Sequence, residues 1–79
     1  MKELTDLVEY IAKTIASNPD DVKVTEEEDE EGYILIKLEV HPDDKGKVIG
    51  RQGRVAQSMR TLLRVAAVKN DTRVGLEIV

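Results

Sequence analysis

Apolar residues recur every three or four positions near the start of the chain. They are Leu4, Leu7, Val8, Ile11, Ala12 and Ile15. This spacing places them on one face of a helix over residues 2–16. Asn18-Pro19 ends the helix, because the residue before a proline avoids helical geometry. The pattern therefore predicts an amphipathic first helix.

The next stretch alternates apolar and polar residues, which is typical of strands. Val22 and Val24 predict a short strand over residues 21–27, and residues 33–40 form the clearest strand. In that second strand Ile34, Ile36, Leu38 and Val40 face the core, while Tyr33, Leu35, Lys37 and Glu39 face away. The acidic run 26–31 leads to Gly32, and we expect it to form a solvated hairpin loop.

The second half of the chain returns to helical spacing. Pro42, Asp43 and Asp44 suit a helix start, so a short helix is predicted over residues 42–49, ending at Gly50. A longer helix follows over 54–69, and a last strand over 74–78. The apolar stripe of the long helix comprises Val55, Ala56, Met59, Leu62, Leu63, Ala66 and Ala67, and Val65 and Val68 lie outside it.

The predicted order is therefore α-β-β-α-α-β. The first two strands lie close enough in sequence to form a hairpin, and two helices separate the second strand from the last, which permits a parallel pairing. We expect an α+β fold in which a three-stranded mixed sheet carries its helices on one face. Residues 1–79 are expected to form a single domain.

Composition excludes several classes of function. The chain has no cysteine, which excludes disulfides and cysteine-ligated metals and makes a cytosolic setting the default. No apolar run approaches the roughly 20 residues of a membrane-spanning helix, and the first residues do not resemble a signal peptide. We therefore expect neither a membrane anchor nor an export signal.

Charge is strongly segregated along the sequence. The net charge of −4 hides residues 1–44, with 4 Lys/Arg against 14 Asp/Glu, and residues 45–73, with 8 Lys/Arg against one Asp. A cationic segment of this kind indicates one surface that attracts phosphate.

The segment Val48-Ile49-Gly50-Arg51-Gln52-Gly53-Arg54 places a Gly-x-x-Gly turn between the two later helices. Its glycines lack a Cβ, and the helix that follows presents N–H groups and a partial positive charge at its start. The alternative is an ordinary pair of helix-end glycines, but the basic neighbours favour phosphate binding. The candidate RNA-binding residues are Lys47, Ile49, Gly50, Arg51, Gln52, Gly53 and Arg54.

Other residues are given lesser roles. Lys45 is a weaker candidate, and Arg60, Arg64 and Lys69 are expected to be solvated helix positions. Val48 and Ile49, with Val55 behind the loop, are candidates for an apolar groove beside the phosphates, although Val55 is better explained as core. The chain has only two aromatic residues, Tyr10 and Tyr33, so stacking platforms are not expected.

Nothing in the sequence favours catalysis. His41 stands alone before a proline and is best explained as a turn residue. The acidic run lacks the spaced ligands and central glycine of a calcium loop. The glycine loop lacks the Gly-Lys-Ser/Thr ending of a nucleotide loop. We therefore expect no enzyme, no cofactor and no metal site.

The chain resembles the KH domain family, in its bacterial type II form. The resemblance is carried by residues 46–54, Gly-Lys-Val-Ile-Gly-Arg-Gln-Gly-Arg, by Leu-Val-Glu-Tyr-Ile-Ala-Lys at 7–13, Asn-Pro at 18–19 and Arg-Thr-Leu-Leu at 60–63, and by the element order. It implies single-stranded RNA binding without catalysis in the cytoplasm, as a small RNA chaperone or regulator linked to cell-envelope growth and cell shape. It also implies self-association or pairing with a larger KH-containing protein.

Two functions follow. The favoured one is an RNA-binding module that holds the phosphate backbone with weak sequence preference. The alternative is a module that chiefly docks a partner protein, with RNA contact secondary. The broad apolar arc of the helix over 54–69 supports a dimer interface there.

Overall fold

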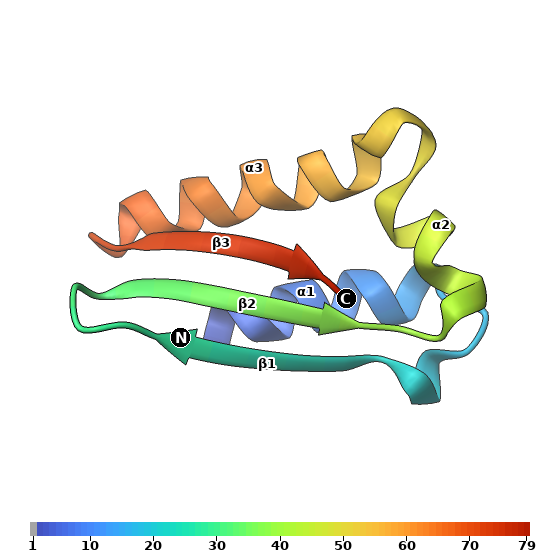
Figure 1. Ribbon diagram of the computed structural model, residues 1–79. Helices are drawn as coiled ribbons and strands as arrows, with labels where there is room; N and C mark the ends of the chain where they lie inside the picture. The colour runs from blue at the N-terminus through green and yellow to red at the C-terminus, as the bar shows by residue number, and fades with distance from the viewer. Residues whose placement is uncertain (1) are drawn as a thin grey trace.

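The protein, described by a computed structural model over residues 2–79, has a three-stranded sheet with helices on one side (Figure 1). The main elements are α1 (Lys2–Ile15), β1 (Lys23–Glu28), β2 (Tyr33–Glu39), α2 (Lys45–Ile49), α3 (Arg54–Lys69) and β3 (Arg73–Ile78). Short 3-10 turns cover Pro19–Asp21, Pro42–Asp44 and Arg51–Gly53. The predicted order α-β-β-α-α-β and the α+β class are confirmed.

The sheet has the strand order β1-β2-β3. β1 and β2 pair antiparallel, with Val24 opposite Leu38, and β2 and β3 pair parallel, with Ile36 opposite Leu76. The mixed sheet is thus confirmed. β2 lies in the centre and is the most apolar strand, whereas the edge strands β1 and β3 carry more charge, as exposed edges require.

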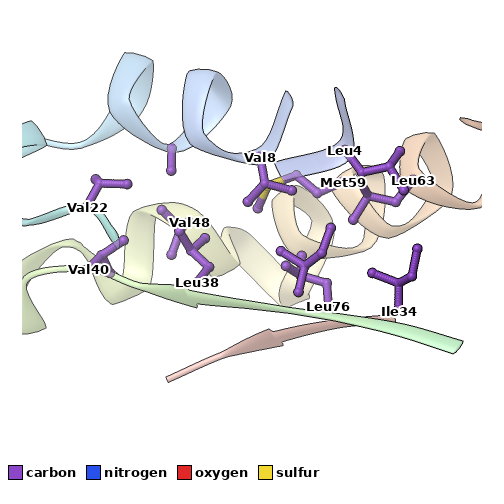
Figure 2. Packing of buried hydrophobic residues seen from close by; sticks show 12 residues of the cluster. Leu4, Val8, Val22, Ile34, Leu38, Val40, Val48, Met59, Leu63 and Leu76 are labelled. Atoms are coloured by element: carbon purple, nitrogen blue, oxygen red, sulfur yellow. The ribbon is translucent and has the colours of Figure 1, made fainter. Parts of the chain in front are cut away.

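The hydrophobic core lies between this sheet and helices α1 and α3 (Figure 2). Alternate residues of β2, namely Ile34, Ile36 and Leu38, are at most 2% exposed, as the period of two predicts. Leu4 and Val8 of α1 pack onto them from one side, and Met59 and Leu63 of α3 from another. Val48 of α2 joins the same core, so the turn between α2 and α3 is fixed at both ends by buried side chains.

The acidic hairpin differs from the prediction. β1 continues through Glu28, which pairs with Ile34, so half of the acidic run is strand rather than loop. The turn itself is short because Asp29 closes it: Oδ1 of Asp29 accepts hydrogen bonds from the N–H groups of Glu31 and Tyr33, both at 2.9 Å. Ladder hydrogen bonds to β2 outweigh the weak strand propensity of glutamate here.

Two helix predictions also need correction. Residues 42–44 form a 3-10 turn, and α2 begins only at Lys45. On α3, Leu62 is 49% exposed and lies outside the core stripe. The buried stripe follows Met59, Leu63 and Ala67 at intervals of four. Leu62 precedes Leu63 by one residue, about 100° around the helix, which turns its side chain toward solvent.

Candidate nucleic-acid interface

The turn between α2 and α3 depends on Gly50. Its φ of 81° and ψ of 170° lie in a region that essentially only glycine occupies. A Cβ at this position would lie 2.5 Å from Cγ2 of Val55 and 2.8 Å from its backbone nitrogen. The N–H of Gly50 meanwhile donates to the carbonyl of Gly46 at 2.8 Å, which ends α2. The chain therefore turns sharply here because the first residue of α3's apolar face lies directly beneath bare backbone.

Gly53 completes the turn in a different environment. Gln52 and Gly53 both have left-handed backbones, with φ values of 56° and 74°. The N–H of Gly53 donates to the carbonyl of Gly50 at 3.0 Å, closing a tight loop. A Cβ at Gly53 would meet no atom within 4 Å. The space beside Gly53 is therefore open to a ligand that approaches the backbone.

The predicted cations surround this turn. Arg51, Gln52 and Arg54 are exposed, and Nη2 of Arg54 donates to Oε1 of Gln52 at 3.3 Å. Within residues 2–79, neither Arg51 nor Arg54 pairs with a carboxylate. Both guanidinium groups remain available to an anionic ligand, which their planar donor arrangement suits when that ligand is a phosphate.

Lys47 occupies a more constrained position than the other predicted contacts. Its Nζ donates a hydrogen bond to Oγ of Ser17 and lies 3.6 Å from Oδ1 of Asp44. The side chain is still 48% exposed. Lys47 therefore joins α2 to the segment after α1 while keeping part of its surface in solvent.

Asp44 anchors this junction, and sequence analysis had given it only a role at a helix start. It is fully buried and accepts hydrogen bonds from the N–H groups of Ser17 and Asn18, at 3.0 and 2.9 Å, and from Nδ2 of Asn18 at 3.2 Å. Burial alone raises the pKa of a carboxyl, but these hydrogen bonds and the charge of Lys47 outweigh it, so the pKa of Asp44 lies below 3.8. The carboxylate stays charged and ties the end of α1 to the start of α2.

The apolar side of the site differs from the prediction in one respect. Val48 is completely buried and cannot line a groove, because its place on α2 points into the core. Val55 is half-buried beneath Gly50 and packs against the core, as expected. Ile49, at 40% exposure, is the residue of this set that offers apolar surface beside the turn.

Residues farther along the cationic segment divide into two kinds. Arg64 and Lys69 are exposed, as predicted, but Arg60 is half-buried and its Nη2 donates to the carbonyl of Leu76 on β3 at 3.3 Å. Lys45 is exposed on α2. His41 acts as a turn residue, since its Nδ1 accepts from the N–H of Asp43 at 3.0 Å.

Neither a metal centre nor a membrane span is found in the part of the chain that the structure describes. Over residues 2–79 no three His, Asp or Glu side chains gather in a way that could hold a metal ion. No helix in the same range is long and apolar enough to cross a membrane.

Comparison with known proteins points to one family. A family model described as "KhpA/KhpB, KH domain" matches residues 5–78. A protein of Halalkalibacterium halodurans named RNA-binding protein KhpA is 51% identical over 74 residues, which cover 92% of this chain and 95% of the relative. The protein of the same name in Clostridium perfringens is 46% identical, over 96% of this chain and 100% of the relative. That of Aquifex aeolicus is 47% identical, over 99% and 98%.

Solved structures share the fold at low identity. A GDP-bound crystal structure of Aquifex aeolicus Era matches 95% of this chain with a TM-score of 0.59 and 19% identity, over 29% of that longer chain. Era in complex with MgGDPNP and a segment of 16S ribosomal RNA matches with a TM-score of 0.58. At this identity the match establishes the architecture and no more.

Proposed function

Because this chain belongs to the KhpA/KhpB family of KH domains, we propose that it binds single-stranded RNA through the turn Gly50–Gly53. The observation that carries the proposal is the open, cation-flanked backbone at Gly53. Phosphates approach that bare backbone, and Arg51 and Arg54 pair with them. A KH loop of this kind clamps four backbone nucleotides.

Each predicted contact has a defined part in this binding. Arg51 and Gln52 are the tips of the loop, with Arg51 on a phosphate and Gln52 on backbone or base. Ile49 offers apolar surface on which a base rests. Lys47 contributes charge from the flank while its Nζ stays with Ser17 and Asp44. Most contacts go to the backbone, so base preference is weak.

A double change in the loop tests the proposal. Arg51→Asp with Gln52→Asp should abolish most binding to a short single-stranded RNA at moderate salt, because two carboxylates then face the phosphates. Lys13→Asp with Thr14→Asp on α1 changes the net charge equally and is the control, since both residues are exposed away from the loop. Fluorescence anisotropy measures affinity and circular dichroism confirms folding. If the folded loop variant binds RNA as wild type does, the proposed mechanism is wrong.

A second candidate function, protein pairing, is favoured by the outer face of α3. Leu62, Val65 and Val68 are 49%, 66% and 72% exposed and follow one another at intervals of three. Exposed apolar side chains gathered on one helix mark an interaction surface. The partner is a second copy of this chain or a larger KH-containing protein of the KhpB kind.

Analytical ultracentrifugation tests self-pairing. Wild type is expected to dimerise at high micromolar concentration and Val65→Asp to stay monomeric, whereas Gln57→Asp, at an exposed polar position of α3, should behave as wild type. A wild-type protein that remains strictly monomeric would exclude the homodimer. If the loop variant loses RNA but still dimerises, the two activities use separate surfaces.

The wider role rests on the family resemblance. We infer that residues 1–79 form one KH domain that acts without catalysis in the cytoplasm, as a small RNA chaperone or regulator with a link to cell shape. The RNA-binding names of relatives that match over nearly their full length support this inference. Crosslinking in the native host, followed by sequencing of the bound RNA, identifies the RNA partners.

A further inference from the structure

A groove runs along the outer edge of β3, away from the glycine turn. Two hollows, of about 430 and 310 Å³, lie side by side there and share Tyr33, Arg64 and Val74 in their walls. Arg60 lines the first and Arg73 the second. We call this surface the α3–β3 groove. Arg60 and Arg64 follow Arg54 on the same helix, roughly 9 and 15 Å along its axis, so the groove continues from the loop.

Tyr33 lies across β3 because residue 75 is glycine. A Cβ on Gly75 would collide with the Tyr33 hydroxyl and lie 3.1 Å from its Cζ. Gly75 pairs with Leu35 in the parallel ladder, and Tyr33 and Leu35 belong to the side of β2 that carries no helix. The tyrosine ring therefore rests on bare backbone with its other side toward solvent, which leaves it half-buried.

Charge differs on the two sides of this ring. Glu27, Glu28 and Asp29 line the hollow on the hairpin side, where a phosphate would be repelled. On the α3 side, Arg64 makes no hydrogen bond or ion pair within residues 2–79. Arg73 is 3.8 Å from Glu31, with both side chains largely exposed, and such a pair is easily exchanged for a phosphate.

We propose that the α3–β3 groove is a second contact for the RNA strand, in which a base stacks on Tyr33 and adjacent phosphates pair with Arg64 and Arg73. The proposal rests on RNA binding at the glycine turn and adds a subsite beyond it. Aromatic stacking combined with cationic backbone contacts is the general chemistry of single-strand recognition. The expectation that this chain lacks a stacking platform is therefore revised for Tyr33.

Strand length separates this contact from the loop. A four-nucleotide RNA fills the loop clamp, whereas an RNA of about ten nucleotides also reaches Tyr33. Tyr33→Leu should weaken binding of the longer RNA roughly tenfold and leave the shorter one unchanged, because one base loses its stack. Tyr10→Leu, on exposed Tyr10 of α1, is the matched control and should change neither.

The arginines provide an independent variant. Arg64→Gln with Arg73→Gln should weaken only the longer RNA, and Lys13→Gln with Lys23→Gln is the control with equal loss of charge. If both groove variants bind the longer RNA as their controls do, while Arg51→Asp with Gln52→Asp abolishes binding, the groove contact is wrong and the loop mechanism stands. If the loop variant binds normally, the loop mechanism fails.

Fluorine NMR tests the groove without altering it. In protein labelled with 3-fluorotyrosine, the Tyr10→Leu variant assigns the two resonances. The Tyr33 resonance should shift with the longer RNA and not with the four-nucleotide RNA, while Tyr10 stays unchanged. A Tyr33 resonance that moves with neither RNA, or equally with both, overturns a separate contact at Tyr33.

Discussion

At the scale of single residues, the two glycines of the turn have different tasks. Gly50 has a backbone and a neighbour, Val55, that exclude any side chain, whereas Gly53 needs only a left-handed backbone beside open space. Gly50 thus maintains the sharp angle between α2 and α3, and Gly53 keeps the phosphate approach clear. The Gly-x-x-Gly pattern predicted both glycines as a platform, but it could not distinguish these tasks, because the distinction depends on what lies beneath each Cα.

Alanine substitutions should separate them. Gly50→Ala should destabilise the fold by roughly 3 kcal/mol or more, since backbone strain and overlap with Val55 add. Gly53→Ala should cost only about 1 to 2 kcal/mol, the ordinary cost of a left-handed alanine. Urea unfolding measures both free energies. Equal losses would show that the contact between Gly50 and Val55 does not constrain the turn.

Asp44 gives the stability of the protein an acid dependence. Its pKa is lower in the folded protein than the ordinary 3.8, so the folded state binds the proton less readily than the unfolded chain. This stabilisation is therefore complete above pH 3.8 and is lost as pH falls through the lower, folded pKa.

Asp44→Asn should therefore be less stable than wild type at neutral pH, because an amide places a donor against the N–H groups of Ser17 and Asn18. The difference in melting temperature should shrink as the pH is lowered through the acid range where wild type becomes protonated. Thermal unfolding by circular dichroism across that range measures it. A difference that is independent of pH would mean that the charge of Asp44 contributes nothing.

At the scale of elements, the period of each helix and strand could be predicted, but the phase of α3 could not be fully resolved. Apolar residues cover most of its circumference, so Leu62 and Leu63 were equally good candidates for the core. The structure buries Leu63 to 1% exposure and leaves Leu62 at 49%. The difference arises because the sheet and α1 contact one arc of the helix, and pattern alone does not give the width of that arc.

Truncation of the two leucines measures this phase. Leu63→Ala should lose about 2 to 5 kcal/mol, since it leaves a cavity among the buried residues of α3 and β2. Leu62→Ala should change stability by no more than about 0.5 kcal/mol at protein concentrations where the chain is monomeric. Urea unfolding compares the two, and a larger loss at Leu62 would contradict the phase described for α3.

At the scale of the whole molecule, long-range neighbours account for most of what sequence analysis missed. The α+β order, the strand pairing and the cationic turn followed from local periodicity and spacing. The bonds of Asp44 to Ser17 and Asn18, and the ring of Tyr33 over Gly75, join residues far apart in sequence. One sequence gives no information on which distant residues meet, so these features emerged only from the fold.

The segregated charge of the molecule predicts how its RNA affinity responds to salt. If the turn neutralises about four phosphates, the logarithm of the binding constant should fall with the logarithm of salt concentration with a slope near −3. The acidic half of the chain contributes no released counterions, so the net charge of −4 does not remove this slope. A titration from low to physiological salt measures it, and a flat response would contradict binding through the phosphate backbone.

The central claim, that the turn Gly50–Gly53 holds RNA by its backbone, is tested most directly by NMR. A four-nucleotide single-stranded RNA is titrated into ¹⁵N-labelled protein, and the shift of every backbone amide is followed. The largest shifts should fall on residues 50–54, with smaller ones at Ile49 and Lys47. If those amides stay unchanged while residues elsewhere in the chain respond, RNA binds at a different surface and the claim is wrong.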